Sequence, residues 1–230
     1  SDGLASASSA AAIPGNGATA SPTETLTLLF RSMFAARCID EMESELVSRG
    51  EAFFHLSAAG HECTAALQPF LIPEDWLHLH YRDRALVLAR GVPPVAFFHN
   101  LLCNRESQSA GRQMSPFISD PERRLLSQNV PVGNHALQAV GVAHQIVRSP
   151  DRSIVVCTMG DGSTQQGEVF EAISESVRAE LPVLFVIEDN GYSISTPTAR
   201  QTFFSLPSRY LAPDRFLGLP IHRFEARDVV

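Results

Sequence analysis

Two uninterrupted apolar stretches constrain the fold of this chain more than any other feature. The first is SIVVCTM at 153–159, and the second is LPVLFVIE at 181–188. Three apolar residues recur between them at helical spacing, namely Val169, Ile173 and Val177. Strands that are apolar on both faces are typical of parallel sheets covered by helices on both sides, and a helix commonly joins neighbouring strands of such a sheet. The sequence therefore predicts an α/β fold with a parallel sheet and helices on both of its faces.

The residues that follow the first strand predict a site for a cation. They read MGDGSTQQGE at 159–168, with Asp161 between Gly160 and Gly162. A carboxylate at the end of a buried strand is costly unless a positive group meets it, and the glycines remove side chains where another body comes close. A helix that opens at Ser163 would add free backbone N–H groups, which favour a phosphate.

The second strand ends in a similar way, at Asn190 before Gly191. Because ligands bind beyond the carboxyl ends of parallel strands, we expect Asp161 and Asn190 to offer oxygen atoms to one point. Carboxylate and amide oxygens suit magnesium, which often shares its coordination with phosphate oxygens. The alternative is that Asp161 caps the helix and Asn190 adopts a turn conformation. The position of both residues at one edge of the sheet favours the metal-site interpretation.

The composition excludes several other classes. All 18 basic residues are arginine, so the chain cannot contain a P-loop lysine, a pyridoxal Schiff base or a lysine nucleophile. The distance from Gly162 to Gly167 does not fit the Rossmann fingerprint. A net charge of −7 disfavours nucleic-acid partners and anionic membranes, and no apolar stretch is long enough to span a bilayer.

The cysteines and histidines point to a reduced protein without a zinc site. The cysteines are scattered without a Cys-x-x-Cys pair, at Cys38, Cys63, Cys103 and Cys157. This usage is typical of buried, reduced thiols and predicts a cytoplasmic location. His78 and His80 stand at strand spacing, but no cysteine or carboxylate lies at ligand spacing nearby, so zinc is disfavoured.

The remaining elements follow from local patterns. Residues 1–20 are small, polar and aperiodic, which predicts a flexible arm ahead of one α/β domain at 21–230. Ser21 and Glu24 form a capping box for a helix that stops at Gly50. Further helices are expected at 60–71, 82–91, 133–149 and about 165–179, with a strand at 75–81 and a long loop at 104–124.

Two local details of the later helices are also expected. In the helix at 133–149, Leu137, Val140 and Val147 would form the buried face, with small residues that allow close packing. Ser163 and Gln166 would form a second capping box, at the beginning of the next helix.

At this point the residues match a known family. GDGSTQQGEVFEA and LPVLFVIEDNGYSISTPT resemble the thiamine-diphosphate motif of the alpha subunit of 2-oxo acid dehydrogenases, the decarboxylating first components of the pyruvate and branched-chain complexes. AFFHLSAAGHE, HYRDRALVLARG, AGRQM and NVPVGNHALQAVG follow the family's order upstream, so the likeness covers roughly 22–230. It implies the diphosphate-binding half of a thiamine-diphosphate-binding fold.

The resemblance implies roles for the residues at the two strand ends. Asp161, Asn190 and the backbone carbonyl of Tyr192 would hold magnesium, and magnesium would hold the diphosphate of the cofactor. Gly160 and Gly162 would let that diphosphate approach.

The resemblance also implies roles for residues from earlier in the chain. Tyr81 and Arg82 match a pair that contacts the phosphates, where arginine acts as a forked donor; the alternative is an ordinary surface pair at a helix start. Val130 and Val132 match a loop that supports the aminopyrimidine ring, although they would also suit loop core. His55 matches a catalytic histidine that faces the reaction channel, and a structural histidine is the alternative.

The implied function is oxidative decarboxylation of a 2-oxo acid, with thiamine diphosphate as the electron sink. The acyl unit would pass to a lipoyl group on an acyltransferase component. In this family the glutamate that activates the cofactor comes from a beta subunit, so the chain would need a beta subunit or beta half, in a heterotetramer. One alternative is a catalytically silent cofactor-binding or assembly module. A magnesium-dependent phosphohydrolase is disfavoured, because no second carboxylate is expected near Asp161.

The chain departs from the family pattern in several places. Glu188 stands where branched-chain relatives carry an arginine, and Asp189 replaces a common asparagine. GRQM at 111–114 resembles the branched-chain enzymes and His55 the pyruvate enzymes, so the substrate signals conflict. The chain stops at RFEARDVV, where the family continues toward a loop with a phosphate-contacting histidine. We therefore expect a chain truncated at its C-terminus, or a fragment of a fused alpha–beta protein.

Overall fold

The two apolar stretches are neighbouring strands of a parallel three-stranded sheet in the computed structural model, which describes residues 21–128, 130–204 and 215–225. β1 spans Trp76–His78, β2 spans Val155–Gly160 and β3 spans Val183–Glu188, in the order β1-β2-β3. The expected α/β fold with a parallel sheet is confirmed. The arm expected at 1–20 lies outside the described residues.

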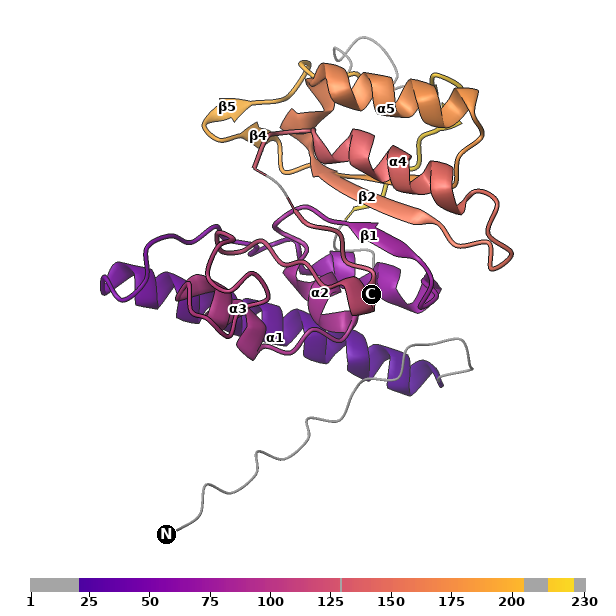
Figure 1. Ribbon diagram of the computed structural model, residues 1–230. Coiled ribbons are helices and arrows are strands. Elements are labelled where there is room, and N and C mark those ends of the chain that lie inside the picture. Colours follow the sequence, from indigo (N-terminus) through magenta and orange to yellow (C-terminus); the bar gives the residue numbers. More distant parts are fainter. Residues whose placement is uncertain (1–20, 129, 205–214, 226–230) are drawn as a thin grey trace.

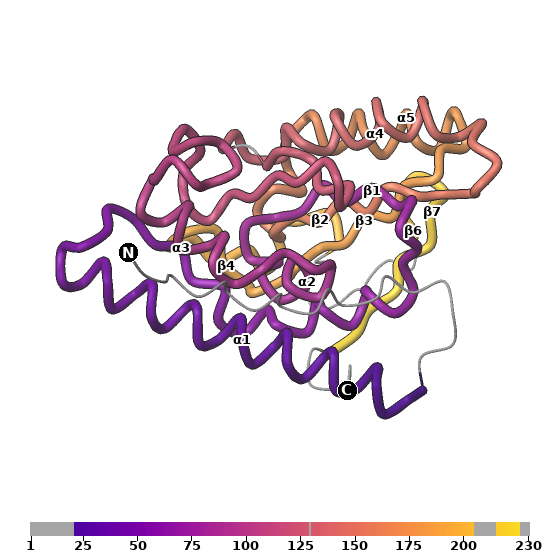
Figure 2. Tube along the Cα trace, turned by 60° about the horizontal axis from the view of Figure 1, so that its bottom comes forward, coloured from indigo at the N-terminus to yellow at the C-terminus, as the bar shows by residue number. Residues whose placement is uncertain are grey.

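Helices cover the two faces of the sheet in separate layers. α4 (His135–Ile146) and α5 (Gly167–Arg178) lie on one side, away from α1 (Pro22–Ser48), in both Figure 1 and Figure 2. Three shorter elements lie on the same side as α1. They are the 3-10 helix η1 (Glu62–Phe70) and the helices α2 (Arg84–Ala89) and α3 (Val95–Leu101).

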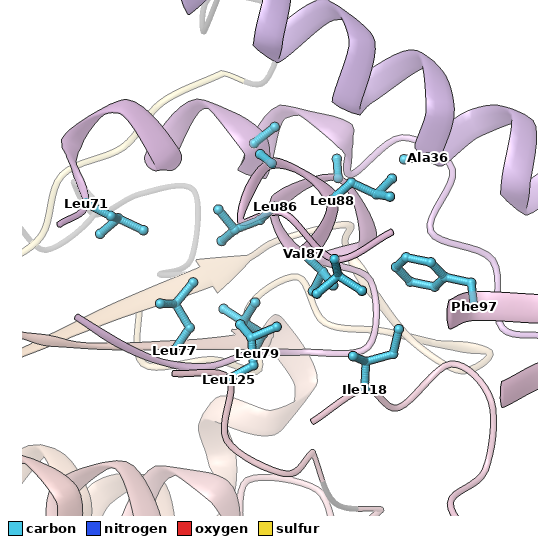
Figure 3. Close-up of a cluster of buried hydrophobic side chains, with 14 of the residues drawn as sticks. Ala36, Leu71, Leu77, Leu79, Leu86, Val87, Leu88, Phe97, Ile118 and Leu125 are labelled. Carbon is cyan, nitrogen blue, oxygen red and sulfur yellow. The ribbon is translucent and has the colours of Figure 1, made fainter. Parts of the chain in front are cut away.

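Alternate residues of β2 point into two hydrophobic cores. Val155, Cys157 and Met159 pack in the core that α4 and α5 form, whereas Val156 packs in the core on the side of α2. Figure 3 shows this second core, in which Leu86 and Val87 of α2 approach Leu77 of β1 and Phe97 of α3. Because β2 is completely buried on both faces, its position is tightly determined.

The capping prediction for α1 is confirmed. The Glu24 carboxylate accepts a 2.8 Å hydrogen bond from the Ser21 backbone N–H, and the Glu24 N–H donates to the Ser21 hydroxyl at 3.3 Å. The helix ends at Ser48, and Gly50 follows with a φ of 73°, which glycine adopts without strain.

Two expected elements on the α1 side differ in detail. The segment expected as a helix at 60–71 is the 3-10 helix η1, which contains Pro69, a residue without an N–H for helical bonding. The strand expected at 75–81 is reduced to β1. The His80 N–H turns away from the sheet ladder and donates to the side chains of Asp83 and Thr158.

One expectation for α4 is partly wrong, and one for α5 is wrong. In α4, Val140 is buried as predicted and alanines make up most of the remaining buried face, whereas Leu137 and Val147 are exposed. Ser163 does not form a capping box with Gln166. It lies in the 3-10 helix η3 (Asp161–Gln165), which the Thr164 hydroxyl closes by donating to the Asp161 carbonyl, and α5 has no side-chain cap.

β3 is only partly covered, which also differs from the expectation. It is the outer strand of the described sheet, most of its residues are half-buried, and Leu184 is 41% exposed. Two small antiparallel hairpins follow, β4 (Tyr192–Ser193) with β5 (Thr196–Pro197) and β6 (Arg215–Phe216) with β7 (Leu219–Pro220). None of the helices in the described ranges has the length and hydropathy required to cross a membrane.

A buried ion cluster connects α1 to α2. Arg84, whose side chain is fully buried, contacts the Glu43 carboxylate at 2.6 Å and the Asp40 carboxylate at 3.2 Å. Asp40 also accepts hydrogen bonds from the Ser57 hydroxyl and the Ala58 N–H. Burial raises the pKa of Glu43, because the Arg84 charge offsets only part of the desolvation.

We predict that Arg84→Met lowers the free energy of unfolding by about 3 kcal/mol or more, because two buried carboxylates lose their cation. Urea denaturation of the variant and the wild type would measure the change. Arg178→Met is the matched control, since Arg178 pairs with Glu175 at an exposed position on α5 and should leave stability nearly unchanged. Equal losses in the two variants would contradict the role assigned to the buried cluster.

Candidate functional site at the carboxyl edge of the sheet

β2 and β3 end side by side, as predicted. Gly160 pairs with Glu188 in the parallel ladder, so Asp161 and Asp189 are the next residues at the same edge. Asp161 is only 2% exposed, and its carboxylate accepts a short hydrogen bond from the Thr198 hydroxyl. The segment that follows β3 therefore folds back over Asp161.

A second carboxylate lies next to Asp161, contrary to the expectation from the sequence. The pKa of Asp189 is raised, first by burial and also by the charge of the neighbouring Asp161 carboxylate. Asp189 is held in place by the Gly191 N–H, which donates to its carboxylate at 2.9 Å. Two adjacent carboxylates are a suitable donor set for a divalent cation.

Asn190 lies at the predicted edge, but its side chain has a local role here. The Asn190 amide oxygen accepts a 2.9 Å hydrogen bond from the Tyr192 N–H, which is the turn geometry weighed as the alternative. Both residues are exposed. An amide oxygen has a second lone pair, so the metal-binding role of Asn190 and of the Tyr192 carbonyl stays a prediction. The described ranges hold no group of three His, Cys, Asp or Glu residues suited to a metal.

The two glycines beside Asp161 have different neighbours. A Cβ atom on Gly162 would lie 2.5 Å from the Ser193 hydroxyl, so glycine is required there by the close approach of β4. A Cβ atom on Gly160 would lie 3.7 Å from His80 Nε2 and 4.0 Å from Arg82 Nη1. The approach of a diphosphate at these glycines stays a prediction, and at Gly162 the neighbour that the structure shows is Ser193.

A cavity of about 220 Å³ brings together three of the predicted residues, Tyr81, Val130 and Val132. Ser163 of η3 also lines it, and η3 begins at Asp161, so the cavity adjoins the edge of the sheet. Its apolar wall comes from Phe54, Leu56, Met114 and Phe117. The arrangement can hold an apolar ring or chain, with the polar side chains of Tyr81 and Ser163 also in the cavity wall.

Arg82 is a cation without an acidic partner. It is half-buried, its guanidinium lies 4.7 Å from the centre of the Tyr81 ring, and it forms no ion pair with any carboxylate that the structure describes. Arg82 also shares a side-chain hydrogen bond with Tyr81. A forked donor beside Gly160 that has no carboxylate partner among the described residues fits a phosphate group. With the carboxylates of Asp161 and Asp189 at the same edge, the donor set fits a diphosphate bridged by a divalent cation.

His55 is not brought into the cavity. Its ring is largely buried and lies 3.2 Å from the Glu43 carboxylate and 3.6 Å from that of Asp40. The neighbouring residues Phe54 and Leu56 line the cavity instead. The structure thus places His55 with the ion cluster around Arg84, which agrees with the structural alternative, and its catalytic role stays a prediction.

The sequence reasoning missed a buried group of titratable residues at this edge. Glu188 is 7% exposed, and its carboxylate lies 2.8 Å from His61 Nδ1 and 3.7 Å from His80 Nδ1. Burial raises the pKa of Glu188 to about 7. Burial, with the nearby Arg82 charge, lowers the pKa of His80 to about 3. The one available signal was an acid at the end of an apolar strand, which requires a nearby compensating group.

Comparison with known proteins adds a family match. A family described as "Dehydrogenase E1 component" matches residues 30–223. The 3-methyl-2-oxobutanoate dehydrogenase subunit alpha of Mycobacterium tuberculosis is 31% identical over 182 residues, which cover 79% of this chain and 47% of that protein. The mitochondrial 2-oxoisovalerate dehydrogenase subunit alpha is 29% identical in Mus musculus and 28% identical in Homo sapiens. Each of these two matches covers 78% of this chain and 41% of the relative. The chain therefore spans less than half the length of each of these relatives.

We predict that Gly162→Ala displaces β4, because the new methyl group would overlap the Ser193 side chain. The variant should lower the melting temperature and increase amide hydrogen exchange at 192–193. Adding Ser193→Gly should restore both measurements, since it removes the overlapping atoms. The matched control is Gly141→Ala, where a Cβ atom would meet nothing within 4 Å. A destabilisation that Ser193→Gly leaves unchanged would show that another contact requires the glycine.

Proposed function

Since the chain belongs to the dehydrogenase E1 component family, we propose that it is the alpha part of a thiamine-diphosphate-dependent 2-oxo acid dehydrogenase. The proposed reaction is oxidative decarboxylation of a 2-oxo acid, with transfer of the acyl group to a lipoyl group on an acyltransferase component. A beta subunit or beta half would complete the site. The observation that carries the proposal is the grouping of Tyr81, Val130 and Val132 in one cavity, with Arg82 next to Tyr81 and without an ion pair among the described residues.

The proposed substrate is a branched aliphatic 2-oxo acid. Support comes from the names of the similar proteins, which act on 3-methyl-2-oxobutanoate or 2-oxoisovalerate. The apolar wall formed by Phe54, Leu56, Met114 and Phe117 also favours an aliphatic chain over a polar one.

The family implies thiamine diphosphate as the cofactor, and we propose magnesium as its metal. Asp161, Asn190 and the Tyr192 carbonyl would hold the magnesium ion, with Asp189 as an adjacent acid. When bound, thiamine diphosphate supplies the electron sink for the loss of carbon dioxide. The expected magnesium ligands are oxygen atoms of the kind that this ion prefers.

The residues of this chain would bind and orient the cofactor. Arg82 would donate its fork of N–H groups to phosphate oxygens, and Tyr81 would donate its hydroxyl beside it. Val130 and Val132, which are exposed at the cavity mouth, would support the ring. His55 could reach the reaction channel only if its ring left Glu43, so its catalytic role is a separate proposal.

A second candidate is a silent cofactor-binding or assembly module. It is favoured by Glu188, a buried acid at the expected phosphate site, and by the Asn190 oxygen, which accepts a bond within its own turn. We also propose a cytoplasmic location for the chain, supported by its four free cysteines.

We predict that Asp161→Ala and Asn190→Ala each abolish magnesium-dependent binding of thiamine diphosphate, because each removes a metal ligand. Titration calorimetry with and without magnesium would measure the affinity. Asp151→Asn is the matched control, since Asp151 is an exposed aspartate that accepts a hydrogen bond from a nearby backbone N–H. Unchanged binding in the two site variants would reject the metal site.

We further predict that the complete alpha–beta assembly decarboxylates branched 2-oxo acids faster than pyruvate. A panel of straight and branched 2-oxo acids, assayed with the same assembly, would measure kcat/KM for each. If the assembly decarboxylates no 2-oxo acid, the silent module is the better description.

We also predict that Arg82→Gln raises the KM for thiamine diphosphate by about tenfold or more, the scale of one lost charge-assisted bond.

A further inference from the structure

The outer face of α1 carries a continuous apolar row. Every fourth position of the helix holds an apolar residue or a cysteine, namely Leu26, Phe30, Phe34, Cys38 and Met42. Cys38 is half-buried, and the other members of the row are between 53% and 67% exposed. The rings of Phe30 and Phe34 stack with their centres 5.9 Å apart. Single exposed apolar residues are ordinary, but a continuous row of them marks a contact surface.

The opposite face of α1 already packs within the chain. Leu29, Ala36 and Ile39 lie in the core on the side of α2, and Asp40 and Glu43 contact Arg84. In both Figure 1 and Figure 2, the other labelled elements lie on one side of α1. The apolar row therefore faces away from the core that α1 helps to form.

The row is symmetric about position 36 of the chain. Its members, continued by the half-buried Leu46, lie at equal distances on either side of that position. A second copy of α1 that runs antiparallel to the first would bring together three pairs, Leu26 with Leu46, Phe30 with Met42, and Phe34 with Cys38. A two-fold contact requires a surface that is complementary to itself in this way.

Two charged residues of the same face follow the same symmetry. Arg31 and Glu41 each lie five residues from position 36, and both are exposed. Neither forms an ion pair with any residue that the structure describes, whereas the neighbouring Arg37 pairs with Glu62 at 2.7 Å. An antiparallel second copy would bring Arg31 of each copy toward Glu41 of the other. A parallel copy would set like charges against each other, so charge complementarity favours the antiparallel arrangement.

We propose that two copies of this chain pair through the outer face of α1, antiparallel about a two-fold axis near position 36. The inference goes beyond the proposed function, because none of the described residues that line the cavity belongs to α1. The row from Leu26 to Leu46 is about 30 Å long at the rise of an α-helix. A contact of one helix from each copy is small beside the interfaces of permanent dimers, so the pairing should depend on protein concentration.

The test is sedimentation equilibrium of the 230-residue chain over a dilution series, which measures the dissociation constant of the dimer. Arg31→Glu and Glu41→Arg should each raise that constant by about tenfold, because each sets like charges against each other at both ends of the contact. The double variant Arg31→Glu with Glu41→Arg should return to the wild-type constant. An equimolar mixture of the two single variants should also associate like the wild type, because opposite charges then face each other between the two variants.

Two further variants test the apolar part of the contact. Phe34→Glu should raise the dissociation constant by about thirtyfold or more, because it places a carboxylate in the middle of the contact. Ile194→Glu is the matched control, since Ile194 is a fully exposed apolar residue between β4 and β5, away from α1 in Figure 1. Its dissociation constant should not change. If Phe34→Glu does not fold, the charge variants alone decide.

Three outcomes would overturn the proposal. The first is a wild-type chain that stays monomeric over the whole dilution series. The second is a dimer whose dissociation constant the charge variants leave unchanged, because the copies then pair through another surface or in another direction. The third is a Phe34→Glu variant that associates with itself like the wild type but no longer binds a beta partner, because the row then belongs to that partner. Failure of the proposed function would appear instead as the absence of thiamine-diphosphate binding, which leaves these measurements unaffected.

Discussion

The parallel pairing of β2 with β3 is the constraint on which the site depends. The register places Gly160 opposite Glu188, so three acidic side chains, Asp161, Asp189 and Glu188, gather where the two strands end. A slip of one residue would turn each side chain of a strand to the other face of the sheet. The complete burial of β2 between two cores prevents such a slip, because its alternate residues pack in opposite directions.

Acidic side chains gather at two places in this protein, and they differ in whether a cation is paired with them. In the cluster between α1 and α2, Arg84 contacts both Asp40 and Glu43, so two carboxylates share one cation. At the carboxyl edge, the buried Asp161 adjoins the exposed Asp189, and Arg82 forms no ion pair with a carboxylate among the described residues. A buried charge without a paired counter-charge is costly. The two clusters therefore differ in that the structure pairs a cation with the carboxylates of only one of them.

The sequence predicted features that depend on local pattern. The two apolar stretches identified β2 and β3, and the Ser21–Glu24 box identified the beginning of α1. The sequence did not predict features that depend on contacts between segments far apart in the chain. Leu137 and Val147 of α4 are exposed, although helical spacing grouped them with the buried Val140. The turn that Thr164 closes replaces the expected cap, and the contact between His61 and Glu188 joins segments that no local pattern relates. The family resemblance supplied residue roles that periodicity alone could not.

The outer position of β3 has a practical consequence for handling the protein. Its half-buried apolar residues lie at the margin of the described sheet, and Leu184 is 41% exposed there. Free strand margins attract strands of other molecules, and flat apolar ones are common starting points for aggregation. A preparation of this chain alone should therefore tend to self-associate at high concentration, and a lysine or proline on the open side of β3 would be a rational way to keep it in solution.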